Sequence, residues 1–326
     1  DYKKVDAKLQ LLEPDLSTLV KQYWTTGDFL IFVSACGIAV RAIAPFVRDK
    51  QTDPAVVCLD ENGQHVIPLL SGHLGGANRL AAIIAASTGS QPVITTATDI
   101  NNLPSLDEWA KNNNLAICDL KAAKNLSALL LDGEKIGVTS DFEQEGELPE
   151  LFSRNPGCKA GICLSYDENK KPYPVTLNLV PQNVYLGIGC RKGVSMETID
   201  ELVREVLERH KISAKALSAV GSLDIKREEQ GLLDFAQKYA LPLTFFSAAE
   251  LNSLDSLGPF VSSAAGEPGF SRSEFVRQVT GVDNVCERAA ALLSGNGEFI
   301  CRKNSKDGVT VAAAKKNSPV MLESVR

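Results

Sequence analysis

The stretch "DFLIFVSACGIAVRAIAPFV", residues 28–47, decides the fold of the first part of this chain. Its apolar run from Phe29 to Ser34 predicts a buried strand, and Gly37 indicates a turn. The residues that follow predict a helix with Ile38 and Ala42 on one face. A strand that passes through a short turn into a helix is the building unit of an α/β sheet. The sequence therefore indicates an α/β fold here.

Further strands and a helix follow directly. In "AVVCLDENGQHVIPLL", residues 55–70, two strands flank Asn62-Gly63, a pair that supplies the positive φ of a tight hairpin turn. The segment "PVITTATD", residues 92–99, predicts another strand. The helix predicted between them has apolar and small residues at helical spacing: Leu80, Ile83, Ile84 and Ser87. We therefore expect an N-terminal α/β domain over residues 1–115.

The pattern of the sequence changes near residue 116. Short apolar runs at 135–140, 161–165 and 175–180 predict strands, so we expect a small β-rich middle domain over residues 116–182. A second α/β domain is expected over residues 183–326, with a solvated tail after Lys315. Its first helix has an apolar stripe made of Ile199, Leu202, Val203, Val206 and Leu207. The predicted fold class is α/β, with two α/β domains joined by a small β-rich segment.

Composition excludes several classes of protein. The chain has 326 residues and a formal net charge of −6. This charge disfavours general electrostatic binding to nucleic acid or to an anionic membrane. The most apolar run is interrupted by Arg41 and Pro45, so no transmembrane helix is expected. The eight cysteines are scattered, without a CxxC pair or a cysteine–histidine cluster. This scatter predicts reduced thiols and a cytoplasmic location rather than a disulfide framework or a zinc site.

Three glycine-rich junctions lie between a predicted strand and a predicted helix: "SACG" (34–37), "SGHLGG" (71–76) and "GIGCRKG" (187–193). A helix N-terminus has unpaired N–H groups and the positive end of a dipole, so each junction could bind an anion. The third helix begins with Glu197 and Asp200, which offset its dipole, whereas the first two helices carry Arg41 and Arg79. An anion is therefore favoured in the first domain. Glycines that only form turns and allow close packing remain an alternative.

His73 lies in the second junction, with glycine before it and two glycines shortly after it, and is one of three histidines in the chain. We interpret it as an exposed imidazole beside an anion site, with a plain turn residue as the alternative. The segment at 92–99 places three hydroxyls and the carboxylate of Asp99 just past a strand end, where α/β sheets carry their sites. Those hydroxyls could instead satisfy the backbone of their own loop.

The third junction resembles a dinucleotide-binding fingerprint. Its glycine spacing departs from that motif, and no acidic residue ends a following strand at the ribose position. A nucleotide-dependent oxidoreductase is therefore a less favoured alternative. The sequence contains no GxxxxGK(S/T), HExxH or GxSxG motif, which excludes P-loop, zincin and serine-hydrolase sites.

Long parts of the sequence resemble the cobalamin-biosynthesis protein G family. The resemblance runs from about residue 28 to residue 315 and is weakest in the middle segment. It rests on "ACGIAVRAIAPFVRDKQTDPAVVCLDENGQHVIPLLSGHLGGANRLA" (35–81), "PVITTATD", "GIGCRKG", "LPLTFFSAAEL" (241–251) and "TGVDNVCERAAALL" (280–293). The last segment has one alanine more than the family pattern, and the resemblance implies a further strand before Asp1.

The resemblance implies a cobalt-precorrin-5A hydrolase of anaerobic cobalamin biosynthesis. Such an enzyme opens the δ-lactone of a contracted cobalt tetrapyrrole and releases acetaldehyde to give cobalt-precorrin-5B, a hydrolase reaction that ends in cleavage of a carbon–carbon bond. The substrate is a broad apolar disc edged with carboxylates, which suits apolar walls, anion sites and a few arginines. No cofactor is expected, since the cobalt comes with the substrate. A carrier that binds the corrinoid without chemistry remains an alternative.

The expected catalytic residues are His73 and Asp99. We expect His73 to act as a general base with Asp99 orienting it, or Asp99 to be the base itself; an axial bond from His73 to the substrate's cobalt is a further possibility. The pKa of His73 is expected to stay near the reference value of about 6.5. Backbone N–H groups of Gly75 and Gly76 would hold the oxyanion. The residues expected to bind substrate are Gly37, Arg41, Ser71, Gly72, Gly75, Gly76, Asn78, Arg79, Thr95, Thr96, Thr98, Gly189, Cys190, Arg191 and Lys192.

The expected partner is the small-molecule cobalt tetrapyrrole, with no nucleic acid and no membrane. We expect the substrate to lie in a cleft between the first and last α/β domains, because glycine junctions occur in both and domain interfaces favour large concave sites. A homodimer, or transient contacts with other enzymes of the pathway, would be compatible with this composition.

Overall fold

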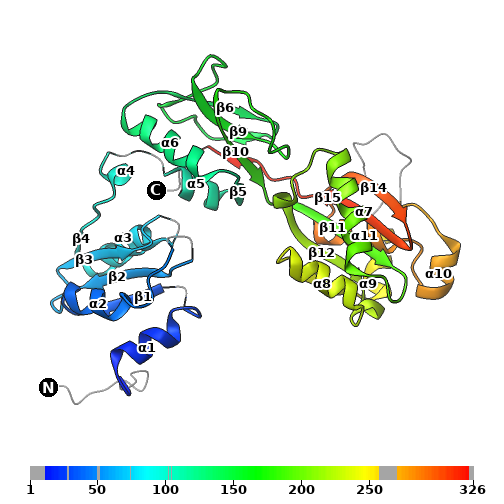
Figure 1. Ribbon diagram of the computed structural model, residues 1–326, viewed down its shortest axis with the longest axis horizontal. Helices are drawn as coiled ribbons and strands as arrows, with labels where there is room; N and C mark the ends of the chain where they lie inside the picture. The colour runs from blue at the N-terminus through cyan, green and yellow to red at the C-terminus, as the bar shows by residue number, and fades with distance from the viewer. Residues whose placement is uncertain are drawn as a thin grey trace. The chain divides into compact units, whose positions relative to one another are not determined.

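The computed structural model describes residues 12–27, 29–49, 52–73, 75–101, 103, 105–256 and 270–322. The chain forms two compact units, residues 1–109 and 110–326, each built of strands and helices (Figure 1). The predicted α/β class is confirmed. The division into three domains at residues 115 and 182 stays a prediction. All eight cysteines are free thiols, and no helix among the described residues is long and apolar enough to cross a membrane.

The first unit is built on a sheet with the strand order β1-β2-β3-β4. Its strands are β1 (Phe29–Val33), β2 (Ala55–Leu59), β3 (His65–Leu70) and β4 (Gln91–Pro92). β1 is parallel to β2, β2 and β3 form the predicted antiparallel hairpin, and β4 is parallel to β3. The Asp60 carboxylate closes the hairpin by accepting the N–H groups of residues 62, 64 and 65. The strand predicted over 92–99 ends early, because residues 97–100 turn into helix α4.

Helices cover both faces of this sheet. The covering helices are α1 (Leu16–Tyr23) and α2 (Cys36–Ile43) on one face and α3 (Ala77–Thr88) on the other, and α4 (Ala97–Ile100) and α5 (Leu106–Asn112) follow β4 in the chain. Val56 and Cys58 of β2 pack with α1 and α2, whereas Ala55, Val57 and Leu59 pack with α3. Since successive side chains of a strand point to opposite faces, α2 and α3 lie on opposite faces of the sheet.

The buried faces of α2 and α3 differ from the predicted ones. α2 buries Ala39, Ala42 and Ile43, and Ile38 is 46 % exposed. The residues that α3 buries are Ala77, Asn78, Ala81 and Ala85, while Leu80 and Ile84 are half-buried and Ile83 and Ser87 are exposed. Alanine adds little bulk, so α3 can lie close to the sheet along its small residues. Hydrophobicity at helical spacing therefore found the helix but misplaced its inner face.

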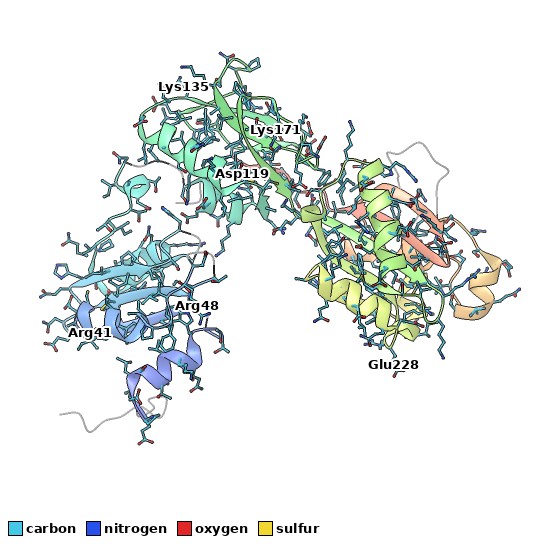
Figure 2. The ribbon with its side chains drawn as sticks, in the orientation of Figure 1. Arg41, Arg48, Asp119, Lys135, Lys171 and Glu228 are labelled. Carbon is cyan, nitrogen blue, oxygen red and sulfur yellow. The ribbon has the colours of Figure 1, made fainter. Side chains whose placement is uncertain are left out.

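The second unit begins with a sheet of order β5-β10-β9-β6-β8. Its strands are β5 (Leu115–Ile117), β6 (Ile136–Ser140), β8 (Phe152–Ser153), β9 (Ala160–Leu164) and β10 (Val175–Pro181), which confirms the three predicted strands. This segment also has helix α6 (Leu120–Leu131), which the sequence analysis did not predict. Asp119 (Figure 2) caps α6 by accepting the N–H groups of Lys121 and Ala122.

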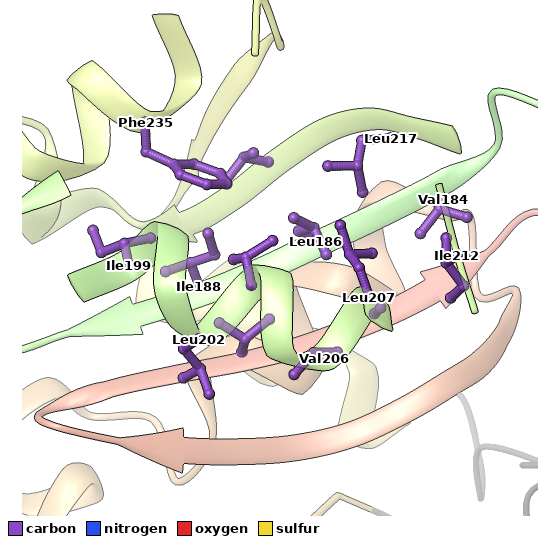
Figure 3. Close-up of a cluster of buried hydrophobic side chains, with 14 of the residues drawn as sticks. Val184, Leu186, Ile188, Ile199, Leu202, Val206, Leu207, Ile212, Leu217 and Phe235 are labelled. Atoms are coloured by element: carbon purple, nitrogen blue, oxygen red, sulfur yellow. The ribbon is translucent and has the colours of Figure 1, made fainter. Parts of the chain in front are cut away.

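The last sheet has the order β13-β12-β11-β15-β14. Its strands are β11 (Val184–Cys190), β12 (Leu217–Leu223), β13 (Leu243–Phe246), β14 (Glu298–Lys306) and β15 (Val309–Lys315); its helices are α7 (Met196–Arg209), α8 (Gln230–Lys238), α9 (Ala248–Asn252), α10 (Glu274–Thr280) and α11 (Val285–Leu293), with short 3₁₀ turns at Ala214–Ala216, Asp224–Lys226 and Ser253–Ser256. The predicted apolar stripe of α7 is buried against this sheet together with Phe235 of α8 (Figure 3). A capping box between Ser247 and Glu250 starts α9.

Helix α11 covers the other face of this sheet at very short range. A Cβ added to Gly187 would lie 1.8 Å from the Cys286 carbonyl oxygen, so only glycine lets α11 approach β11. Leu186 and Ile188, on either side of Gly187 in the strand, belong to the core beneath α7.

The tail after Lys315 is not solvated as predicted. Its strand β16 (Val320–Met321) pairs in parallel with β7 (Gln144–Glu145). Val320 and Leu322 are each 4 % exposed, and the Met321 N–H donates to the Asn113 side chain. The prediction failed because two apolar side chains spaced two apart in a polar tail are enough to bury one face of a short strand.

Candidate active site

The direction of the strands brings two loops of the first unit to one edge of its sheet. β3 leads into the loop of residues 71–76, and the segment after β4 runs in the same direction as β3. The two loops meet through Asn78, whose Nδ2 donates to Thr96 Oγ1 at 2.8 Å and to Asp99 Oδ2 at 3.0 Å. Asn78 is 6 % exposed, so this amide is a fixed part of the site.

The loop of residues 71–76 uses its glycines for its own packing. Ser71 has a φ of +56°, and its hydroxyl donates to the Asp53 carbonyl at 2.9 Å. A Cβ on Gly75 would lie 2.4 Å from the Ser71 Cβ, and a Cβ on Gly72 would lie 2.8 Å from Asn78 Oδ1. Gly76 occupies the N-cap position of α3 with a φ of +85°. The glycines therefore allow a tight loop that fixes where His73 lies.

His73 stands among three side chains from other elements. Its Nε2 is 2.9 Å from Thr98 Oγ1 and 3.7 Å from Asp99 Oδ2. Its Nδ1 lies 3.8 Å from Glu108 Oε2 and is buried without a hydrogen-bond partner among the described residues. The His73 side chain is 21 % exposed, so the imidazole is more enclosed than the flanking glycines suggested. Each ring nitrogen thus has one carboxylate near it.

This arrangement changes the acidity of the imidazole. The Glu108 carboxylate raises the pKa of His73 above its usual value, partial burial opposes that rise, and Asp99 and Asp107 add to it. This pKa was expected from the sequence to stay near the reference value, whereas the surrounding carboxylates raise it. That expectation took account of the helix dipole and of a bound ligand, but not of the carboxylates of residues 107 and 108.

Glu108 is the site residue that the sequence analysis missed. It lies in the first turn of α5, where Asp107 and Glu108 follow Ser105. The Ser105 hydroxyl accepts the Glu108 N–H at 3.3 Å, so a short cap signal was present in the sequence. Nothing in that signal says that this helix start lies beside residue 73, because the contact spans 35 residues of chain and depends on tertiary structure.

The backbone N–H groups at the start of α3 are largely engaged. The Gly76 N–H donates to the His73 carbonyl, the Ala77 N–H to Ser71 and the Asn78 N–H to Gly72, all at 3.0 to 3.1 Å. The expected oxyanion role of the Gly76 N–H is therefore wrong for this conformation, because the loop folds back on its own helix. An oxyanion role for the Gly75 N–H stays a prediction.

Other predicted substrate-binding residues of the first unit lie apart from this cluster. The carboxyl ends of β1 and β2 lie together, as the hydrogen bond from Ser34 to Leu59 shows, and β3 runs the opposite way. Gly37 and Arg41 therefore occupy the edge opposite to His73. The Arg41 guanidinium would lie 3.6 Å from a Cβ on Gly37, and Arg41 is exposed on α2 (Figure 2). Arg79 and Thr95 are exposed and adjoin residues of the cluster in sequence.

The predicted residues of the second unit line a cavity of that unit. Gly189, Cys190, Arg191 and Lys192 contribute to a cavity of about 650 Å³. The Gly193 N–H, the counterpart of a phosphate-binding amide, donates instead to Glu229 Oε2 at 2.9 Å. A carboxylate of the protein therefore occupies the place that a dinucleotide phosphate would need, which disfavours the oxidoreductase alternative. Within the described residues no group of three or more His, Cys, Asp or Glu side chains could hold a metal ion.

The chain resembles known proteins along most of its length. The chain matches three family models, described as cobalamin synthesis G N-terminal over residues 18–99, cobalamin biosynthesis central region over 104–181 and cobalamin synthesis G C-terminus over 184–314. It is 39 % identical to the cobalt-precorrin-5A hydrolase of Salmonella typhimurium over 89 % of this chain and 83 % of that protein. The chain belongs to the cobalamin synthesis G family.

Two further proteins that the chain resembles share less of its sequence. The cobalt-precorrin-5A hydrolase of Priestia megaterium is 28 % identical over 95 % of this chain and 84 % of that protein. A crystal structure of a cobalamin biosynthesis protein G homologue from Sulfolobus solfataricus is 26 % identical, covering 91 % of this chain and 85 % of the other with a TM-score of 0.38. The family resemblance inferred from the sequence is confirmed by the family models and by the Salmonella relative.

Proposed function

We propose that this chain is a cobalt-precorrin-5A hydrolase of anaerobic cobalamin biosynthesis. The observation that carries the proposal is its 39 % identity to a protein of that name across most of both chains. The cluster of His73, Asp99, Thr98 and Glu108 supports it, because an imidazole between two carboxylates is suited to moving protons in a hydrolysis. The substrate would be the contracted cobalt tetrapyrrole with its δ-lactone.

Lactone opening requires a water to lose a proton as its oxygen attacks the carbonyl carbon. Neutral His73 would take that proton at Nε2, the nitrogen near Thr98 and Asp99. When the tetrahedral intermediate collapses, the carbon–oxygen bond of the lactone breaks, and the imidazolium returns the proton to the departing alkoxide. Glu108 stabilises the imidazolium formed between these steps from the Nδ1 side, and so raises the basicity of the ring. Asp99 could instead be the base itself, because its Oδ2 lies beside His73 Nε2, at a distance of 3.7 Å.

The freed alcohol then loses the two-carbon unit. His73 would remove the proton of the freed hydroxyl group. At the same time the bond between the hydroxyl-bearing carbon and the macrocycle breaks, which forms acetaldehyde. The electron pair of the broken bond passes into the conjugated macrocycle, which takes up a proton at the carbon that lost the fragment. One water is consumed and one acetaldehyde released, so this reaction needs no oxidant or reductant. We propose that the protein uses no cofactor of its own and receives cobalt only as part of its substrate.

The test is the reaction of the purified full chain with cobalt-precorrin-5A under anaerobic conditions. Acetaldehyde should appear in equimolar amount to the substrate consumed, and a corrinoid larger by one water and smaller by one acetaldehyde should be seen by mass spectrometry. A protein that binds the substrate stoichiometrically but releases no acetaldehyde would be a carrier, and the hydrolase proposal would then be wrong.

A further inference from the structure

The cavity of the second unit lies at the carboxyl ends of parallel strands. β11 and β12 are parallel, and the cavity is lined by Cys190 at the end of β11 and Leu223 at the end of β12. The chain leaves β11 toward β12 on one side, and the hairpin of β14 and β15 lies on the other side. Such a crevice at the carboxyl edge of an α/β sheet is the usual place for a ligand. Its volume of about 650 Å³ is typical of small-molecule sites.

The charges on the cavity lining are unbalanced. Asp283 is paired with Arg288, Lys226 with Glu229 and Lys306 with Glu201 and Glu205. The cations Arg191, Lys192 and Lys303 have no carboxylate within 4.0 Å among the described residues. The remaining acid of the lining is Asp307, which is exposed at the turn between β14 and β15. The lining therefore presents an excess of positive charge.

Lys303 is placed by a costly local structure. The register of β14 against β15 shifts between Cys301 and Asn304, so the strand bulges at residues 302–303. The Lys303 N–H that the bulge removes from the ladder donates to Glu287 Oε1 at 2.9 Å, and Glu287 is 0 % exposed. Bulges re-aim side chains beside functional sites, and a buried carboxylate that holds one is expensive to desolvate. The bulge leaves Lys303 half-buried on the cavity wall.

The walls between these cations are apolar. Leu223, Ile225, Val279 and Val285 contribute to the lining. Arg191 and Lys192 follow β11, whereas Lys303 lies on β14, which is two strands away and so about 10 Å across the sheet. Separated cations around an apolar floor match an apolar body with spaced carboxylates better than one compact phosphate. The Glu229 carboxylate at the Gly193 N–H also disfavours a phosphate there.

We propose that this cavity is a tetrapyrrole-binding site of the second unit, in which Lys303, Arg191 and Lys192 pair with peripheral carboxylates of the macrocycle. The inference rests on the proposed function for the class of ligand, and it adds a site without the imidazole cluster of the first unit. Lys303 acts as the anchor, because it is half-buried and has no carboxylate partner among the described residues, and so gains a charge-assisted contact when the ligand arrives.

The test is calorimetric titration of the full chain with cobyrinic acid, a stable cobalt corrinoid rich in carboxylates. Lys303→Glu should raise the Kd about tenfold or more, and Lys303→Gln by less, since the first change introduces repulsion and the second only removes attraction. Lys159→Glu is the matched control, because it makes the same change of charge at an exposed lysine outside the cavity lining. Its Kd should equal that of the wild type, and all variants are first compared by melting temperature.

Three results of the binding experiment would overturn the proposal. They are an unchanged Kd in both Lys303 variants, equal binding of the uncharged methyl ester of cobyrinic acid, and displacement of the probe by NADPH at comparable concentration. Failure of the proposed function looks different, because binding is measured without turnover. Binding that depends on Lys303 without any release of acetaldehyde would uphold this site and reject the hydrolase. Normal acetaldehyde release with the same KM in Lys303→Glu would do the reverse.

Discussion

At the scale of single residues, the candidate site depends on which side chains surround one imidazole. His73 Nε2 faces Thr98 and Asp99, and its buried Nδ1 faces Glu108. Because the pKa of His73 is raised, a larger fraction of the protein molecules has a protonated His73 ring at neutral pH than would be expected for a free histidine. The stabilising effect of this charged form on the fold is full below a pH of about 6.5 and is lost as pH rises through the raised pKa.

Removing the imidazole should abolish most of the turnover. We expect His73→Ala to lower kcat by about 10²–10⁴-fold with little change in substrate affinity, because a general base acts mainly in the transition state. Acetaldehyde release under saturating substrate measures kcat. The matched control is His65→Ala, which removes an exposed histidine of the same unit that pairs with Asp60. Near-normal turnover of His73→Ala from acid to neutral pH would leave Asp99 as the candidate base.

Removing the charge of Glu108 should move the pH profile of activity. The neutral imidazole is the base, so kcat/KM falls on the acidic side as His73 becomes protonated. Glu108→Gln removes the main influence that raises the pKa of His73, and the acidic limb should therefore move to lower pH. The profile of kcat/KM against pH measures this shift. A lower rate with an unmoved limb would mean that Glu108 only supports the fold.

At the scale of elements, the loop between β3 and α3 decides where the imidazole lies. We expect Gly75→Ala to lower the free energy of unfolding of the first unit by about 1–3 kcal/mol, because the new Cβ would lie 2.4 Å from the Ser71 Cβ. Gly89→Ala is the control: it has a φ of +74° at the end of α3 with open space around it, and should cost only about 1 kcal/mol. Denaturant unfolding measures both, and equal costs would argue against the tight loop.

At the scale of the whole molecule, the two compact units have separate hydrophobic clusters and should respond separately to a core substitution. Gly187→Ala forces α11 away from β11 and should destabilise the second unit by about 1–3 kcal/mol or more. Trp24 belongs to the first unit, whereas Trp109 lies in α5 at the boundary between the units. In a Trp109→Phe background, tryptophan fluorescence should therefore report an unchanged transition of the first unit while circular dichroism reports an earlier one. A shift of both would mean that the units unfold as one.

Local sequence patterns located most elements. The apolar stripe of α7 and the hairpin at Asn62-Gly63 depend on residues that lie close together in the chain, so spacing alone predicted them. The inner face of α3 was misjudged, because alanines pack on the sheet and the larger Ile83 remains exposed. The tail strand β16 was missed, because its partner β7 lies far away in the sequence. Periodicity identifies an element but does not identify what the element packs against.

By itself, the sequence determined the α/β class and the family. It also identified His73, Asp99 and the two arginines Arg41 and Arg79 as candidate site residues. All of these depend on residue types and short spacings. Tertiary structure decided which of them meet. The antiparallel course of β3 sends the His73 loop to one edge of its sheet and leaves Arg41 at the other. The start of α5 brings Glu108 to the imidazole across 35 residues of chain. Chain direction within a sheet and contacts between distant segments are set by the packing of the whole unit, and no local pattern encodes them.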